Sequence, residues 1–339
     1  MHSIEERTFE EVLDLTKDLE RDLLLGNGFS IAAHGAFNYA QLLDRVSVSD
    51  DVRAIFATAR TPNFEAVMRV LLAEMQGMND RERADAKAKI DALKRALIQS
   101  VHEVHPPRRN AISVTEWDHC VNFLEHFIGR KRKGRILTTN YDLLLSWAVA
   151  PDRDIGKNRR LNAYEGFRGG PYGGLGGATI IYLHGALHLY MNNGWPQQMQ
   201  YLNTGVPLHD HIAARLSQNQ FPIIVTEGAA ALKKPTGPGF LQDAFTAFRG
   251  TCKGGQKKAL FTLGHGLGPE DRHLLELIPK GTVQTICLGA FGSADREAFR
   301  EIAKGWIATR AKDGKPLKVY IFGSEGVVWG PKARPATAS

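Results

Sequence analysis

Seven short apolar runs constrain the fold of this chain more strongly than any other feature of its sequence. They are three to six residues long, several are rich in β-branched side chains, and most are apolar at nearly every position. This pattern is typical of strands in a parallel sheet that helices cover on both faces. The runs are residues 23–25, 135–138, 179–183, 222–226, 259–263, 283–288 and 318–322.

Helical patterns fall between several of these runs. They cover residues 269–278 and 294–310, and Ser293 is the predicted N-cap of the second. A further helix is predicted over residues 8–19, because Thr8 and Glu11 have capping-box spacing. The alternation of strands and helices predicts an α/β fold with a doubly wound, Rossmann-like parallel sheet.

One region, residues 46–130, interrupts the alternation. It contains no convincing strand and three helical patterns, over residues 63–78, 80–104 and from Ser113 onward, where Glu116 completes a capping box. We therefore expect a helical insertion domain. The predicted organisation is a Rossmann domain of residues 1–45 and 131–328, the insertion at 46–130, and a disordered tail at 329–339.

Composition and charge narrow the class of protein. The 339 residues are 43% hydrophobic and 23% charged, as in ordinary globular proteins. The three cysteines form no C-x-x-C pair, which argues against a structural zinc module. The acidic N-terminus has no apolar leader, and the long uncharged stretches contain polar residues. We therefore expect a cytoplasmic protein without a membrane span.

The net charge of +7 is unevenly distributed along the chain. Residues 1–20 carry seven acids and two bases, net −5, so the remainder carries 7 − (−5) = +12. A basic body favours anionic ligands such as a dinucleotide, nucleic acid or an acidic partner. The cluster at residues 130–135 is equally explained as the solvated last turn of a helix.

Ligands in open α/β sheets bind beyond the carboxyl ends of the strands, so the residues after each strand are candidates. Residues 26–30, Gly-Asn-Gly-Phe-Ser, follow the first run. Glycine lets backbone N–H groups approach a phosphate, although a plain tight turn would use the same residues. The last such segment is Gly264-His265-Gly266-Leu267, with Asp271 one turn later.

Two further strand ends carry polar side chains. Asn140 and Asp142 follow the second run, where they could begin the predicted helix 143–149, bind a ligand, or do both. His184, followed by Gly185, ends the third run. A histidine there is either a hydrogen-bonded core residue or a general base, with an ordinary pKa near 6.5.

Taken together, these motifs resemble the sirtuin superfamily. Residues 26–30 are similar to its phosphate loop G-A-G-x-S, residues 138–142 to T-x-N-x-D, and His184-Gly185 to its catalytic H-G. Residues 264–267 look like its later G-x-S ribose loop, from which His265 and Gly266 depart. The resemblance covers residues 22–45 and 131–325.

The chain departs from the deacetylase sirtuins, because it has neither their zinc module nor their G-I-P-x-F-R stretch. It looks instead like bacterial sirtuin-like effectors of anti-phage defence, which carry helices in place of the zinc module and hydrolyse NAD to nicotinamide and ADP-ribose. The helical segment 46–130 fits that description.

The resemblance implies an NAD glycohydrolase that uses no metal and depletes NAD in abortive infection. Asn140 would orient water or ribose, His184 would act as the base, and Asp142 would hold the nicotinamide ribose. Because constant loss of NAD would kill the host, a sensor or activator subunit, or an oligomer, is implied. The implied NAD-binding residues are Gly26, Asn27, Gly28, Phe29, Ser30, Thr139, Gly185, Gly264, His265, Gly266 and Asp271.

Alternatives from other classes remain open. The chain could be a regulatory module that holds NAD or ADP-ribose without cleaving it, or a nucleic-acid-binding protein, although it shows no reader motif. A metal site at His209 and His211, or at His184 and His188, is disfavoured because no acid or cysteine stands at ligand spacing. Residues 162–180 are a linker or a lid, and Glu65 and Glu227 are left unassigned.

Overall fold

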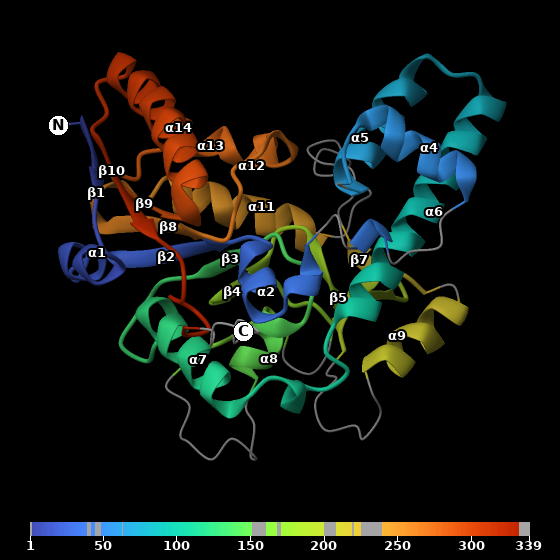
Figure 1. The fold of residues 1–339 in the computed structure, drawn as a ribbon, viewed down its shortest axis with the longest axis horizontal. Helices are drawn as coiled ribbons and strands as arrows, with labels where there is room; N and C mark the ends of the chain where they lie inside the picture. The colour runs from blue at the N-terminus through green and yellow to red at the C-terminus, as the bar shows by residue number, and fades with distance from the viewer. Residues whose placement is uncertain are drawn as a thin grey trace, which may run out of the picture.

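A seven-stranded parallel sheet forms the centre of the protein (Figure 1). The computed structural model describes residues 2–38, 42–44, 49–62, 64–150, 161–167, 171–199, 208–218, 220–224 and 239–331. The strands lie side by side in the order β1-β10-β9-β8-β2-β3-β4. Their bounds are β1 His2–Glu6, β2 Glu20–Leu25, β3 Ile136–Thr138, β4 Ile180–Tyr182, β8 Lys258–Leu263, β9 Thr285–Ala290 and β10 Leu317–Gly323.

This order is the doubly wound arrangement that the sequence predicts. Numbered from β2, six strands run 3-2-1-4-5-6 across the sheet, which is the Rossmann order. The chain winds outward in one direction from β2 to β4 and in the other from β8 to β10. The direction reverses between β2 and β8, which are hydrogen-bonded neighbours, so the topological switch point lies there.

Helices cover both faces of the sheet because successive residues of its strands point to opposite sides. In β2, Leu23 and Leu25 belong to one hydrophobic cluster and Leu24 to the other. The first face is covered by α1 Phe9–Leu15, α7 Val114–Ile128 and α8 Leu144–Val149 (Figure 1). The second is covered by α11 Gly239–Cys252, α12 Arg272–Leu275, α13 Leu277–Lys280 and α14 Gly292–Lys312.

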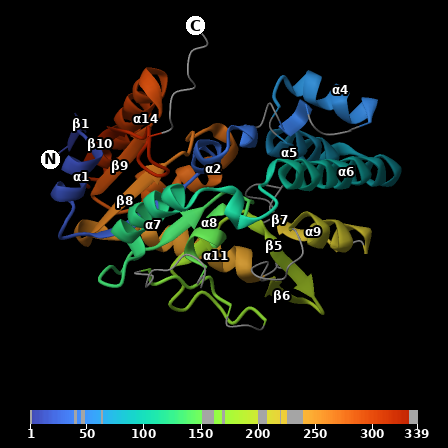
Figure 2. The same cartoon turned by 60° about the horizontal axis from the view of Figure 1, so that its bottom comes forward.

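Three further helices pack on one another beyond the end of the sheet (Figures 1 and 2). They are α4 Asp50–Ala59, α5 Phe64–Glu74 and α6 Asp80–Val104. The described residues between 46 and 130 contain helices and no strand. The next helix, α7, begins at the predicted capping box of Ser113 and Glu116 and contacts β2. The division of the chain into domains stays a prediction.

One predicted strand lies outside the parallel sheet. The run at 222–226 contributes β7, Pro222–Ile224, which pairs antiparallel with β5, Gly185–Asn192, in a small sheet completed by β6, Trp195–Gln198. The apolar pattern of this run predicts that it is buried in the core, but it does not predict which strand is its partner.

Some predicted helix bounds are also corrected. The last helix begins at Gly292 after Phe291, so Ser293 lies inside its first turn and is not the N-cap. The segment at 269–278 is broken into a 3₁₀ turn, Pro269–Asp271, followed by the two short helices α12 and α13. The first helix keeps its predicted capping box at Thr8 and Glu11 and ends at Leu15.

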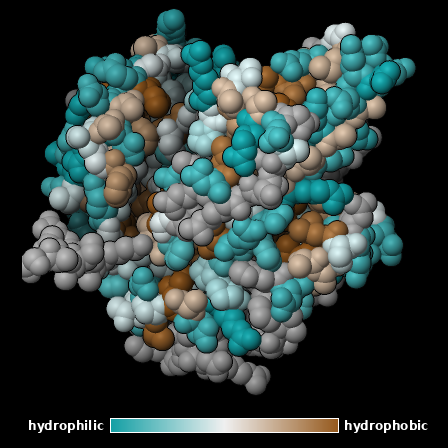
Figure 3. Space-filling model, turned by 45° about the vertical axis from the view of Figure 1, so that its right-hand side comes forward, coloured by the Kyte–Doolittle hydropathy of each residue, from teal (hydrophilic) through white to brown (hydrophobic). Residues whose placement is uncertain are grey.

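The surface carries no single dominant apolar face in the view of Figure 3, where apolar residues form small patches among hydrophilic ones. Among the described helices, none combines the length and apolar character needed to cross a bilayer. Several segments of interest lie outside the described part of the chain. They are a second basic cluster at residues 157–160, Glu227, the side chains of Glu65 and His209, and the tail from residue 332.

Candidate functional site

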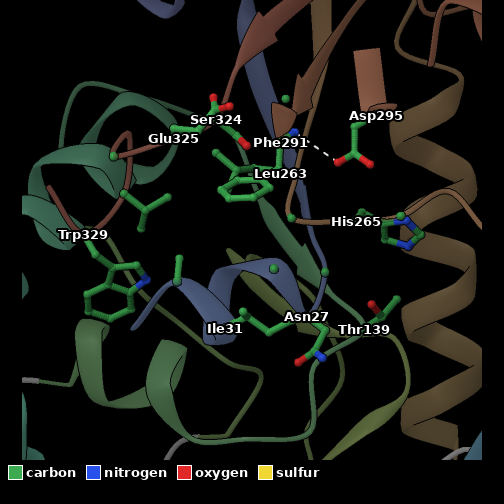
Figure 4. A pocket seen from close by; sticks show the side chains of 18 of the residues that line it. Asn27, Ile31, Thr139, Leu263, His265, Phe291, Asp295, Ser324, Glu325 and Trp329 are labelled. Carbon is green, nitrogen blue, oxygen red and sulfur yellow. Dashed lines mark hydrogen bonds between the residues drawn. The ribbon is translucent and has the colours of Figure 1, made fainter. Parts of the chain in front are cut away.

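A cavity of about 810 Å³ opens at the carboxyl ends of β2, β8, β9 and β10 (Figure 4). Its volume is typical of small-molecule sites, and its place at the switch point is where doubly wound sheets bind ligands. The residues that line it from the predicted set are Gly26, Asn27, Gly28, Thr139, His184, Gly264, His265, Gly266 and Asp271.

The glycine loop after β2 is in direct backbone contact with the loop after β8. The amide of Gly28 donates to the carbonyl of Gly264 at 2.7 Å, and that of Gly26 to Leu263 at 3.0 Å. A Cβ on Gly28 would lie 2.6 Å from the Cα of Gly264, and one on Gly26 2.5 Å from the Cα of His265. Gly264 itself has a φ of 64°, which favours glycine.

This contact explains the glycines of the first loop. Gly26 and Gly28 are not among the described residues with positive φ, so close approach and not an unusual turn requires them. The amides of Phe29 and Ser30 donate to Gly26 and Asn27, at 3.0 Å each. These amides would therefore have to exchange partners to bind an anion, and the predicted phosphate contact stays a prediction.

Ser30, Asn140 and Asp142 form a buried polar cluster behind the glycine loop. The hydroxyl of Ser30 donates to Asp142 Oδ2 at 2.5 Å and accepts from Asn140 Nδ2 at 3.0 Å. Asp142 Oδ1 also accepts the amide of Leu144 at 2.9 Å, so it orders the start of α8 as an Asx residue would. The three residues lie outside the cavity lining.

The cluster contains an ionisable group in a hydrophobic setting. Burial raises the pKa of Asp142, and the hydrogen bonds from Ser30 and Leu144 oppose that rise. The side-chain oxygen of Asn140 is buried and has no hydrogen-bond partner among the described residues. An acceptor left in this state is the kind of group that a water molecule or ligand hydroxyl completes.

The second polar cluster faces the cavity. Asp271 lies between two imidazoles, with Oδ1 at 3.2 Å from His184 Nε2 and Oδ2 at 3.0 Å from His265 Nε2. His265 Nδ1 accepts the amide of Leu267 at 3.0 Å. All three side chains are at most 9% exposed, so water screens these interactions poorly.

The charge of Asp271 is set by its neighbours. Burial alone would raise its pKa, but the interactions with His184 and His265 outweigh burial and hold the pKa far below its usual range. Asp271 is therefore an anion at any working pH, and its partners are two groups that can carry positive charge.

The remaining predicted residues have structural contacts. Gly185 has a φ of 79°, and a Cβ there would meet the Ile223 carbonyl at 1.9 Å, so β7 requires this glycine. The Asn27 side chain donates to the Phe37 carbonyl at 2.9 Å. The Phe29 ring packs against Trp329. Gly185 and Phe29 lie outside the cavity lining, as do Ser30, Asn140 and Asp142.

Sequence reasoning missed the wall formed after β9 and β10. Phe291 and Asp295 come from the start of α14, and Ser324, Glu325 and Trp329 follow β10 (Figure 4). Both strands are among the predicted runs. The residues that follow these two strands are therefore strand-end candidates as well, and that position is the signal that identifies the wall.

No group of three or more potential ligand side chains in the described residues is placed to hold a metal ion. The described cysteines are all buried, and burial raises the pKa of Cys252 to about 12.

A family model described as a domain of unknown function, DUF4917, matches residues 23–329. The chain belongs to the DUF4917 family. No curated protein matches its sequence. Among solved structures, a Sir2 homolog in complex with NAD matches 91% of the DUF4917 chain and 97% of its own, with 12% identity and a TM-score of 0.36. This likeness is too low to support conclusions about the fold or the site, which follow instead from the contacts described above.

Replacing Gly28 with alanine tests the contact between the two loops. Alanine normally favours a helix over glycine, but here its Cβ must push apart two backbones, so we expect unfolding free energy to fall by about 1–3 kcal/mol. Urea denaturation measures the loss. The matched control is Gly35→Ala, where nothing lies within 4 Å of the added carbon. Equal stability of the two variants would contradict the contact.

Replacing Ser30 with alanine tests the buried cluster. The variant loses a hydrogen bond to a buried carboxylate, which is worth about 1.5–3 kcal/mol when the carboxylate is ionised. Because the Ser30 bond lowers the pKa of Asp142, its loss raises that pKa further. An acid whose pKa is higher in the folded state costs stability as the pH rises.

The destabilisation by Ser30→Ala should therefore be larger at about pH 7 than at about pH 3, because the raised pKa of Asp142 leaves its carboxyl mostly protonated at the lower pH. Urea denaturation at both pH values measures it, with the exposed Ser293→Ala as the control. If the loss of unfolding free energy were the same at both pH values, the hydrogen bond from Ser30 would not affect the pKa of Asp142.

Proposed function

We propose that this DUF4917 protein binds NAD in the cavity at the switch point and hydrolyses its nicotinamide–ribose bond, releasing nicotinamide and ADP-ribose. The observation that carries the proposal is the position of His184. This histidine, with its carboxylate partner Asp271, lines the same cavity as the glycine loops after β2 and β8.

The reaction asks for few catalytic groups. Breaking the bond to nicotinamide develops positive charge on the ribose, and the departing ring is a good leaving group, so no general acid is required. A base that activates water contributes about 10²- to 10⁴-fold, and His184 supplies it in the proposal. The buried, unpartnered oxygen of Asn140 supports its proposed part in orienting water or ribose.

Asp142 acts indirectly in this scheme. Its side chain lies behind the glycine loop and is bonded to Ser30, which also accepts from Asn140. In the proposal, Asp142 therefore holds the side-chain amide of Asn140 in place through Ser30, and this side chain contacts the nicotinamide ribose.

The wall after β9 and β10 suits the other end of the dinucleotide. The ring of Phe291 is 71% exposed and presents an aromatic face to a base. Asp295 and Glu325 offer carboxylate oxygens to ribose hydroxyls, as acids do in other dinucleotide sites. The adenosine end is therefore assigned to this wall and the nicotinamide end to His184.

In this proposal the protein is an effector of anti-phage defence that depletes NAD in the cytoplasm. The support is the motif resemblance together with a cavity lined by part of the same strand-end residues, among them Gly28, His184 and Gly264. Such an effector needs to be silent before infection, so a sensor subunit or assembly into an oligomer turns it on.

Substitution at the base and the amide tests the activity. We expect His184→Ala and Asn140→Ala each to lower nicotinamide release from NAD at least tenfold, because each removes a positioned group. Chromatography of nicotinamide measures the rate, and circular dichroism confirms the fold. The control is His211→Ala on α9 Leu208–Ser217, outside the cavity lining.

The assay also separates the competing functions. Equal turnover by the wild type and both variants would contradict the assigned residues. NAD binding in calorimetry without nicotinamide release, alone and with the product of the neighbouring gene, would favour a regulatory module. Salt-dependent DNA binding without affinity for NAD would favour a nucleic-acid-binding protein.

A further inference from the structure

Asp271 joins two histidines that come from different strand ends, and the proposed reaction requires only one of them. His184 follows β4, His265 follows β8, and the two Nε2 atoms face opposite oxygens of one carboxylate. His265 and Gly266 are also the residues at which the chain departs from the G-x-S motif of the resemblance. The proposed reaction therefore does not explain why His265 contacts Asp271.

One hydrogen bond and two contacts with the carboxylate indicate where the protons lie. His265 Nδ1 accepts the amide of Leu267 at 3.0 Å, so in the neutral ring the hydrogen is on Nε2, which faces Asp271. An ionised carboxylate only accepts hydrogen bonds, so the neutral ring of His184 also directs an Nε2 hydrogen toward Asp271. Its Nδ1 then keeps the lone pair.

We infer that Asp271 and His265 are positioning residues for the proposed NAD hydrolysis, which hold His184 in the tautomer that accepts a proton at Nδ1. This inference rests on the proposed function. His265 fixes the carboxylate from one side, and the carboxylate fixes the imidazole of His184 from the other. Asp271 also stabilises the imidazolium that forms when His184 takes up a proton.

The step balances in atoms and charge. A water molecule gives one proton to His184 Nδ1, and its oxygen bonds to the ribose carbon C1′. The bond from C1′ to the nicotinamide nitrogen breaks, and its electron pair stays on the ring, which leaves as neutral nicotinamide. The proton on His184 then passes to solvent, and Asp271 remains a carboxylate throughout.

Four titratable groups determine how His184 responds to pH. Asp271 and His265 act as described, the His273 ring on α12 stacks on His184 with centroids 5.8 Å apart, and the Tyr141 ring lies 6.2 Å away. Among these, only Asp271 carries negative charge at neutral pH. Removing that charge therefore disfavours the imidazolium form of His184.

The test compares Asp271→Asn with the wild type in two measurements. We expect kcat/KM for NAD to fall at least tenfold, chiefly through kcat, and the midpoint of its acid limb to move to lower pH by about one to three pH units. The exposed control Glu276→Gln removes the same charge near the site but outside the cavity lining, and should leave the profile unchanged.

Two substitutions at His265 provide a second test of the inference. Glutamine places an N–H donor where Nε2 stood, so His265→Gln should retain the wild-type midpoint, whereas His265→Leu should lower it toward that of Asp271→Asn. If both variants keep the wild-type profile while folded, His265 does not position the carboxylate.

Nitrogen NMR of labelled histidines decides the inference without turnover. The His184 signal, assigned by its absence in His184→Ala, should show hydrogen on Nε2 in the neutral ring and titrate at lower pH in Asp271→Asn. A neutral ring with hydrogen on Nδ1, or an unchanged midpoint, would overturn the inference even if NAD is cleaved. If the NMR result holds but NAD is not cleaved, only the proposed function fails.

Discussion

The backbone contact between Gly28 and Gly264 is the constraint on which the rest of the site depends. The two loops leave the neighbouring strands β2 and β8 at the switch point and meet with no side chain between them. Because Gly26 has no side chain, the Cα of His265 can lie 2.5 Å from the point that a Cβ would occupy. The first loop thereby packs against the backbone of His265, and the imidazoles of His265 and His184 both contact Asp271.

Two buried carboxylates in this region have pKa values shifted in opposite directions because their partners differ. Asp142 accepts hydrogen bonds from the neutral hydroxyl of Ser30 and the amide of Leu144, so burial dominates and its pKa rises. Asp271 has two imidazoles, so its pKa falls despite similar burial. Environments that push the pKa values of two acids apart commonly mark different chemical roles. Here they separate an acid that orders the loop from an anion that faces the cavity.

The sequence was sufficient to predict what depends on local pattern. Six of the seven strands of the parallel sheet, the capping boxes of α1 and α7, and the gathering of His184, Gly264 and Thr139 at one edge follow from local spacing, apolar runs and strand ends. The edge strand β1, His2–Glu6, was not predicted, because its sequence contains no apolar run. Features that depend on a distant partner could not be predicted. The close approach of Gly28 to Gly264 joins segments more than two hundred residues apart in the chain, and no local spacing records it.

The small antiparallel sheet shows the same limit. Pro222–Ile224 reads as a parallel strand because its side chains are buried, whereas its partner β5 is set by the glycine at position 185. Likewise, the bridge from His265 through Asp271 to His184 needs the order of the strands before it can be seen. The motif at residues 264–267 resembles a ribose loop, and the fold brings its histidine to a carboxylate that the motif does not contain.

The two ends of the sheet distribute their polar groups differently, which bears on where a ligand belongs. At the amino ends of the strands, the buried Asp22 accepts the amide of Arg135, the hydroxyl of Thr251 and the ammonium of Lys258, at 2.8, 2.8 and 3.1 Å. Both oxygens are satisfied, and the residue ties β2, β3, β8 and α11 together. At the carboxyl ends, the Asn140 oxygen lacks a partner among the described residues. Since a buried acceptor in that state costs about 1–3 kcal/mol, the carboxyl ends of the strands carry a cost that the satisfied Asp22 at the amino ends does not.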